Sequence, residues 1–234
     1  MQMPFVQTPI KSKVFEFYLS GYNLAEVSFL VKGFSEGFRI PYSADRLPLP
    51  RDCKNHRSAL ANSAATSAKI SSELRLGRIM GPFDIKPDHL ICSPLSLIPK
   101  SQPGTFRLIH DLSYPHGKSI NDSINKEFTE VHYDSIDTIV DKVKSCGRHC
   151  LMAKTDIEDA FRIIPIHQDD RFLLGFTWDQ QGKKQFYMDC CLAMGLNISC
   201  QLFTRFSDAL QWIMENIFNA VVSHIIDDFF LCGA

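Results

Sequence analysis

Two adjacent aspartates within an apolar segment near the carboxyl terminus are the strongest constraint that this sequence places on its fold. Residues 220–233, AVVSHIIDDFFLCG, form two short apolar arms around Asp227 and Asp228. Aspartate is depleted in β-strands, and adjacent negative charges repel each other. A solvated hairpin turn would tolerate such a pair, and a bound cation would remove both penalties. The segment therefore predicts a hairpin whose tip is either a polar turn or part of a metal site.

A third aspartate, Asp156, ends the stretch CLMAKTD, which we predict to be a buried strand. An aspartate in this place can cap a helix, or it can face a ligand from a rigid scaffold. Mg²⁺ prefers oxygen ligands and often takes one or two carboxylates together with substrate phosphates. Two such ions, about 3.5–4 Å apart, can stabilise the attacking and leaving oxygens of an in-line displacement. Asp156, Asp227 and Asp228 together predict a site for two Mg²⁺ ions, with Mn²⁺ as a substitute.

The amino-terminal part of the chain has helical patterns. Asn23 and Glu26 are typical of a capping pair at the start of a helix, and Gly33 is the expected end of that helix. The predicted apolar stripe of this helix consists of Leu24, Val27, Leu30 and Val31. We therefore expect residues 1–90 to form a helical N-terminal extension.

The remainder, residues 91–234, alternates strand and helix patterns. The arms SPLSLIPK and TFRLIHDL flank Pro103-Gly104, a turn signal, and predict a β-hairpin. Three further elements are expected: an amphipathic helix near 135–144, a hairpin formed by FLLGFTW and KQFYMDCCL, and a helix over 199–219. The sequence thus predicts a mixed α/β architecture in which Asp156 and the Asp227-Asp228 pair lie at strand ends.

Composition narrows the class of protein. With 234 residues, 45% hydrophobic and 22% charged, the chain can bury a sizeable core. A formal net charge of −1 does not exclude nucleic-acid binding, because a local basic groove is sufficient. The eight cysteines show no zinc-ribbon spacing. No apolar run is long enough for a signal peptide or a membrane span, so we expect an intracellular protein with reduced thiols and no membrane partner.

Four segments, in this order, resemble the fingers hairpin and the three successive palm motifs of reverse transcriptases: LSLIPK with FRLIHDLS, KTDIEDAFRIIPIH, CLAMGLNISCQLF and HIIDDF. The resemblance is greatest to the DIRS group of tyrosine-recombinase retrotransposons. It implies an α/β (α+β) fold of right-hand fingers and palm, with the aspartates on an antiparallel palm sheet. It also implies RNA-directed DNA polymerisation, with deoxynucleoside triphosphates as substrates and an RNA or DNA template carrying a DNA primer as partner. The oligomeric state stays open.

The resemblance assigns roles to the residues of the first and third palm motifs. Asp156, Asp227 and Asp228 fall on the metal-binding aspartates, and the main-chain carbonyl of Ile157 falls on a contact to the second ion. Phe161, which by periodicity alone would be a core aromatic, falls on the residue that packs against the sugar of the incoming nucleotide. An aromatic ring there leaves no room for a 2′-hydroxyl, so the resemblance implies a preference for deoxynucleotides.

Four further residues are assigned to the nucleotide. Lys100 and Arg107 flank the turn of the first hairpin and fall on basic residues that hold the triphosphate, although without the resemblance they would be ordinary exposed cations. Met194 and Gly195 belong to the second palm motif, where Leu-Ala-Met-Gly replaces the retroviral Leu-Pro-Gln-Gly. Methionine cannot make the polar contacts of that glutamine, whereas Gly195 keeps the close backbone approach.

The position of the motifs suggests that the polymerase is incomplete. The chain ends six residues after Asp228, so we expect fingers and a partial palm over residues 91–234, with the thumb absent. An alternative reading is a non-catalytic retroelement remnant that acts as a nucleic-acid-binding or interaction module. An RNA-templated RNA polymerase would share the carboxylates, but Phe161 argues against it.

Overall fold

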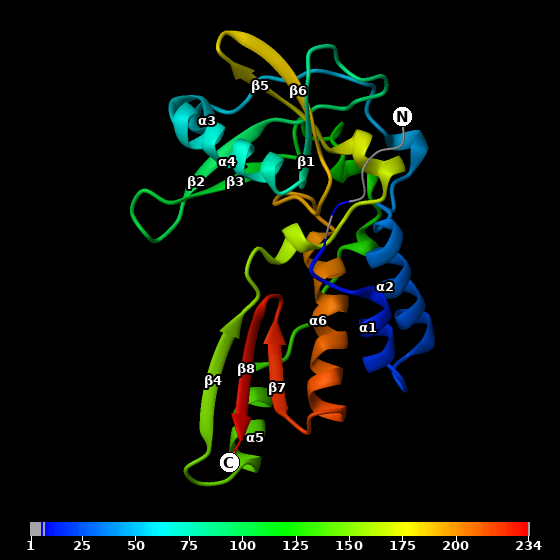
Figure 1. Ribbon diagram of the computed structural model, residues 1–234, viewed down its shortest axis with the longest axis vertical. Coiled ribbons are helices and arrows are strands. Elements are labelled where there is room, and N and C mark those ends of the chain that lie inside the picture. The colour runs from blue at the N-terminus through cyan, green and yellow to red at the C-terminus, as the bar shows by residue number, and fades with distance from the viewer. Residues whose placement is uncertain (1–5, 7, 234) are drawn as a thin grey trace.

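The computed structural model describes residue 6 and residues 8–233, so Ala234 lies outside the described part. It is a mixed fold of helices and antiparallel sheets, as the sequence predicts. Figure 1 shows one sheet beside the long helix α6 at one end of the molecule, and a second sheet with a projecting hairpin at the other. The segments that connect these two parts carry the first two palm-like motifs.

The first sheet carries the three aspartates. Its antiparallel strands are ordered β4-β8-β7 and have the bounds β4 Leu151–Asp156, β7 Val221–Ile225 and β8 Asp228–Gly233. Asp156 pairs in register with Asp228, and Ile225 pairs with Asp228 on the other side. The helix α5 (Ile136–Ser145) packs against β7 and β8, and α6 (Ser199–Asn216) packs against β7. The predicted hairpin around Asp227 is therefore confirmed, and its tip lies at the same end of the sheet as Asp156.

The prediction that residues 150–156 form a buried strand was wrong in one respect. β4 is a strand, but all six of its residues are exposed. Among the described residues it pairs only with β8, as an edge strand, and α6 packs against β7 on the far side of the sheet. The apolar residues Leu151 and Met152 are consequently 73% and 63% exposed. An apolar pattern identifies a strand, but burial depends on what packs against it.

The second sheet is ordered β1-β6-β5, and a separate hairpin is formed by β2 and β3. The bounds are β1 Ile79–Phe83, β2 Leu95–Pro99, β3 Phe106–His110, β5 Gly175–Gln180 and β6 Lys183–Asp189. Both hairpins predicted from turn signals are confirmed. Because β1 pairs with β6, the first 90 residues are not entirely helical and share a sheet with the remainder of the chain. The boundary near residue 90 stays a prediction.

The amino-terminal helices pack beside α6 (Figure 1). The helical segments not yet given are α1 Ser12–Tyr18, α2 Leu24–Glu36, α3 Arg57–Ala61 and α4 Ser63–Arg75, with short 3₁₀ turns at Ala44–Arg46, Asn121–Ser123, Lys126–Phe128, Ala160–Ile163 (η4) and Gln168–Leu174 (η5). A core shared by α1, α2 and α6 contains Phe15, Phe34, Phe203 and Phe206. A second core, between α4 and the β1-β6-β5 sheet, contains Ile70, Phe176, Trp178 and Tyr187.

The start of α2 matches its sequence pattern, and its end does not. The Asn23 side chain accepts hydrogen bonds from the backbone N–H groups of Ala25 and Glu26, at 3.0 and 3.1 Å. Leu24 is 83% exposed and does not belong to the buried stripe. Gly33 does not end the helix, which continues to Glu36.

Gly33 is instead required by packing. A Cβ at this position would lie 2.1 Å from the ring of Phe38, and Phe38 is a buried member of the main core. The glycine therefore lets an aromatic ring approach the helix backbone.

No described helix combines the length and the apolarity that a membrane crossing would need.

The close contact at Gly33 gives a stability prediction. Gly33→Ala should lower the free energy of unfolding by about 1–3 kcal/mol, because the clash with Phe38 forces the core to shift. This loss should exceed the gain of about 1 kcal/mol that alanine brings to a helix interior. Denaturant unfolding of the parent and the variant measures the net change in the free energy of unfolding. Ser28→Ala, at an exposed position of the same helix, is the control, and it should not destabilise the protein. A stabilised Gly33→Ala variant would contradict the packing account.

Candidate active site

The turn between β7 and β8 is held in a strained conformation. Ile226 has φ +56°, a left-handed conformation that is a genuine outlier for a β-branched residue and costs on the order of 1–3 kcal/mol. Two hydrogen bonds hold the turn: the Ser207 hydroxyl of α6 donates to the Ile226 carbonyl at 2.7 Å, and the Ile157 N–H donates to the Asp227 carbonyl at 3.1 Å. The tip is thus attached to α6 and to the end of β4, and this places Asp227 close to Asp156.

Asp156 and Asp227 both line one pocket with a volume of about 490 Å³. Asp228 lies opposite Asp156 in the sheet register, but it does not line the pocket. Its carboxylate instead forms an ion pair with Lys154 at 3.0 Å, and the side chains of Lys154 and Asp228 are 67% and 50% exposed. The structure therefore brings two of the three predicted carboxylates into the cavity and leaves the third at its edge.

The carboxylate of Asp227 is held in an unfavourable environment. Its pKa is raised above the ordinary value, first by burial and then by the negative charges of Asp156 and Asp228, which the positive charge of Arg107 only partly offsets. Asp227 is thus the member of the cluster at which desolvation and like-charge repulsion coincide. Such an environment favours either a proton or a cation.

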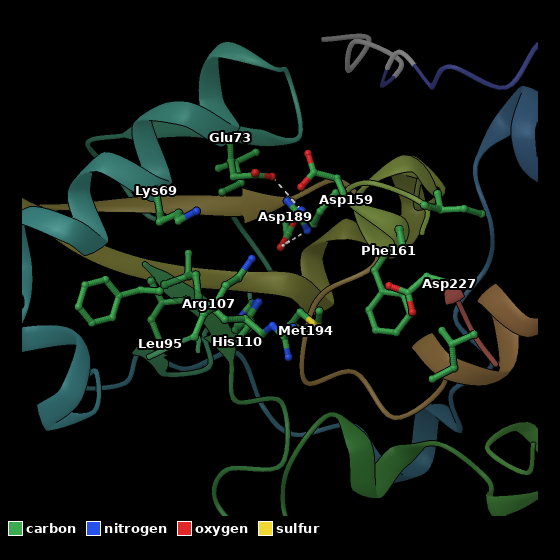
Figure 2. Close-up of a pocket in the computed structure, with 18 of the residues that line it drawn as sticks. Lys69, Glu73, Leu95, Arg107, His110, Asp159, Phe161, Asp189, Met194 and Asp227 are labelled. Carbon is green, nitrogen blue, oxygen red and sulfur yellow. Dashed lines mark hydrogen bonds and ion pairs between the residues drawn. The ribbon is translucent and has the colours of Figure 1, made fainter. Parts of the chain in front are cut away.

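The nucleotide residues predicted from the hairpin and from the first two palm motifs, Gly195 excepted, line the same pocket. Lys100, Arg107, Ile157, Phe161 and Met194 all contribute to its wall. In Figure 2, Phe161 and Asp227 lie toward one end of the pocket, and Lys69 and Leu95 lie toward the other. These residues come from α4, from the β2-β3 hairpin, from the segment after β4, from the loop before α6 and from the β7-β8 turn, segments that the fold brings together.

The ring of Phe161 is only partly buried. It packs edge-on against Phe203 of α6, with the ring centroids 5.7 Å apart. One part of the side chain therefore rests on the core while another lines the cavity. The ring is both a packing residue and part of the pocket wall, so the two readings of its sequence position are compatible.

Gly195 does not line the pocket, unlike its neighbour Met194. It has φ +124°, and a Cβ would lie 2.0 Å from the carbonyl oxygen of His110. The His110 N–H donates to the Met194 carbonyl at 2.8 Å. The close approach in this structure is thus to the backbone of β3, and glycine lets the Met194 loop reach that strand.

Sequence reasoning missed an ionic cluster in the pocket wall. Its members are Glu73, Arg78, Asp159, Arg162 and Asp189. Arg162 binds Glu73 at 2.8 Å and Asp189 through two atom pairs at 2.8 and 3.0 Å. Burial alone would lower the pKa of the Arg162 guanidinium, but the charges of Asp189 and Glu73 outweigh it, so the pKa is raised. Only the charged residues next to Asp156 in the motif hinted at this cluster, because their partners lie far away in the sequence.

The metal prediction can be compared with the donor set. Among the described residues, no group of three or more His, Cys, Asp or Glu side chains converges on a point that could hold a metal ion. Asp156 and Asp227 supply two carboxylates to the pocket, which is the number that Mg²⁺ commonly takes from a protein when phosphates and waters complete its shell. The donors present are therefore compatible with Mg²⁺ bound together with a substrate.

Comparison with known proteins identifies the family. The model of the family described as reverse transcriptase (RNA-dependent DNA polymerase) matches residues 98–234, more than half of the chain. The chain belongs to the reverse transcriptase family. The match begins within β2 and includes both Asp156 and the Asp227 turn. No curated protein sequence matches significantly.

A solved reverse transcriptase shares the fold. It is a foamy viral protease-reverse transcriptase in complex with double-stranded DNA, and it superposes with a TM-score of 0.59 at 17% sequence identity. The alignment covers 99% of this chain and 40% of the viral chain, so the present chain corresponds to less than half of that protein. The fold class predicted from the sequence, fingers and palm with an antiparallel palm sheet, is confirmed.

The environment of Asp227 gives a prediction for the metal-free protein. An acid with a raised pKa binds its proton more tightly in the folded state, so the fold loses stability as the pH rises from the ordinary value of about 4 through the raised value. Asp227→Asn removes this loss and should raise Tm at pH 7 in the presence of EDTA. The gain should disappear as the pH falls toward 4. Scanning calorimetry between pH 4 and pH 7 measures the gain in Tm and its dependence on pH.

Asp228→Asn is the matched control for this prediction, because it lies on the same hairpin and removes an exposed carboxylate that has a cationic partner. Its effect on Tm should be smaller than that of Asp227→Asn, because the lost ion pair with Lys154 offsets the relief of repulsion at Asp227. An equal gain in the two variants would show that the effect is general to the hairpin and not specific to the environment of Asp227.

Proposed function

We propose that this protein is the RNA-directed DNA polymerase domain of a retroelement and adds deoxynucleotides to a primer by two-metal phosphoryl transfer. The observation that carries the proposal is one pocket lined both by Asp156 and Asp227 and by the cations Lys100 and Arg107. Membership of the reverse transcriptase family supports it. The palm motifs of this chain most resemble those of the DIRS group, which favours an origin in a DIRS-like tyrosine-recombinase element.

Asp156, Asp227, Asp228 and the main-chain carbonyl of Ile157 would hold the two Mg²⁺ ions. The ions would supply positive charge at the attacking and leaving oxygens of the displacement. The raised pKa of Asp227 supports this assignment, because a cation relieves the repulsion that a bare carboxylate experiences there. Asp228 would exchange its contact with Lys154 for a contact at the edge of the metal site.

The other pocket residues would bind and orient the nucleotide. Lys100 offers a compact point charge and Arg107 a planar fork, a combination suited to a triphosphate. Phe161, supported from behind by Phe203, would lie against the sugar and exclude a 2′-hydroxyl. Met194 and the backbone at Gly195 would contact the nucleotide or the template. The partner would be an RNA or DNA template with a DNA primer, and the complex of the foamy viral relative with double-stranded DNA is consistent with that.

The carboxylates give the first functional prediction. Asp156→Asn and Asp227→Asn should each reduce extension of a DNA primer on an RNA template by about 100-fold or more, since each removes charge stabilisation at the reacting centre. Extension should require Mg²⁺ or Mn²⁺. Asp179→Asn, an exposed carboxylate outside the pocket, is the control and should extend at the rate of the parent.

Two results would contradict the proposal in different ways. Undiminished extension by the Asn variants would show that the site is wrongly assigned. Nucleic-acid binding without any nucleotide addition, unaffected by changing all three aspartates, would instead identify a non-catalytic binding module.

The aromatic wall gives the second functional prediction. Phe161→Ala should raise the incorporation of ribonucleotides relative to deoxynucleotides by roughly 10- to 100-fold, because it opens space where the 2′-hydroxyl would lie. Single-nucleotide incorporation kinetics measure the ratio. A parent enzyme that prefers ribonucleotides would favour an RNA-templated RNA polymerase instead.

A further inference from the structure

Arg162 lies immediately after Phe161, in the 3₁₀ turn η4, and it has no part in the chemistry proposed above. Its side chain is only 15% exposed, although arginine is rarely buried without a partner. Its polar atoms contact two segments that are distant in the sequence: Glu73 in α4, and the stretch from Asp189 at the end of β6 to Leu192 in the loop that follows. A buried guanidinium with this many partners fixes the positions of those segments relative to η4.

The contact of Arg162 with the loop after β6 connects this side chain to the segment that carries Met194. The Arg162 Nη1 atom donates to the carbonyl oxygen of Leu192 at 3.0 Å, and Leu192 lies two residues before Met194. The Leu192 N–H in turn donates to the Ile164 carbonyl at 3.0 Å. The loop that carries Met194 is therefore attached to η4 through the Arg162 side chain and to Ile164, just after η4, through the backbone.

Arg162 itself lines the pocket, as do Phe161 and Met194. The Arg162 side chain thus links the turn that carries Phe161 to the loop that carries Met194. A displacement of Arg162 would move Phe161 directly through the chain, and it would move Met194 through the Leu192 carbonyl.

The geometry is specific to arginine. The Nη atoms meet both oxygens of Asp189, and Nε separately meets Glu73. Such a planar fork, with its donors in fixed directions, cannot be reproduced by the single ammonium group of lysine. Lysine would retain the positive charge that Asp189 and Glu73 require, so a lysine variant separates position from charge.

We propose that Arg162 is a positioning residue that sets the placement of Phe161 and Met194 in the pocket and thereby controls discrimination between deoxyribose and ribose. This inference rests on the proposed function for its substrate. It assigns no contact between Arg162 and the reacting atoms. Its effect should therefore appear in the selectivity of the pocket more than in the rate of the chemical step.

The test uses Arg162→Lys in the full chain. The ratio of kcat/KM for deoxynucleotide to that for ribonucleotide should fall by about tenfold, because small displacements of positioning groups have effects of this order. The KM for the deoxynucleotide should rise more than its kcat falls. An unchanged ratio would overturn the proposal.

Arg39→Lys is the matched control. Arg39 also makes a two-pronged contact to a buried aspartate, through Nε and Nη2 to Asp170 at 2.7 and 2.9 Å, and neither residue lines the pocket. This substitution should lower stability without changing the nucleotide ratio. A similar fall in both variants would show that loss of any such ion pair disturbs selectivity.

A second measurement does not depend on catalysis. Hydrogen–deuterium exchange should increase in residues 157–164 and 190–195 of Arg162→Lys, and not in those segments of Arg39→Lys. If the parent protein extends no primer, the proposed function fails, while this pattern still decides whether Arg162 positions the two segments. Unchanged exchange in both segments would overturn the proposal.

A milder substitution covers the case in which Arg162→Lys does not fold. Glu73→Gln removes the negative charge of the α4 partner and keeps the contacts to Asp189 and Leu192. It should shift the nucleotide ratio in the same direction by a smaller factor, and a Glu73→Gln protein that folds with an unchanged ratio and unchanged exchange would count against the proposal.

Discussion

Repulsion among carboxylates at one end of the β4-β8-β7 sheet is the constraint on which the rest of the site depends. The register of the sheet places Asp156 opposite Asp228, and a strained turn places Asp227 beside them. Such an arrangement costs stability in the absence of a cation. The surrounding structure maintains it through α6, whose Ser207 holds the turn, and through the backbone at Ile157. Charge repulsion, turn strain and the contacts that offset them thus occur together in the part of the pocket where the proposed chemistry would take place.

The pocket connects this charged end of the sheet to the β2-β3 hairpin. Cations on the hairpin line the same cavity as two carboxylates, and an aromatic ring resting on α6 forms part of its wall. The ionic cluster around Arg162 is part of that wall and joins α4, β6 and the Met194 loop. The N-terminal segment therefore contributes to the site through Glu73 and Lys69 as well as through the β1 strand. The carboxylates at the end of the β4-β8-β7 sheet thus supply negative charge to the site, and the ionic cluster around Arg162 holds the segments of the pocket wall together.

Local signals predicted much of this structure, and long-range contacts account for what they missed. The Asn23 cap, both turn-defined hairpins and the Asp227 turn follow from neighbouring residues, so the sequence pattern was sufficient. The exposure of β4, the helical position of Gly33 and the partner of Asp228 depend on packing between distant segments. The Arg162 cluster is the clearest case, because Glu73 and Asp189 lie far from it in the sequence. The site assignments from family resemblance remain predictions about chemistry, although the structure gathers most of those residues in one pocket.

The central claim is that Asp156 and Asp227 form a metal site when a nucleotide is present. Paramagnetic broadening of backbone amide resonances by Mn²⁺, recorded with a deoxynucleoside triphosphate in the solution, tests it most directly. The account predicts selective broadening of residues 156–161 and 226–228 in the parent protein and its loss in Asp227→Asn. Broadening that is centred elsewhere, or that is unchanged by Asp227→Asn, would contradict it.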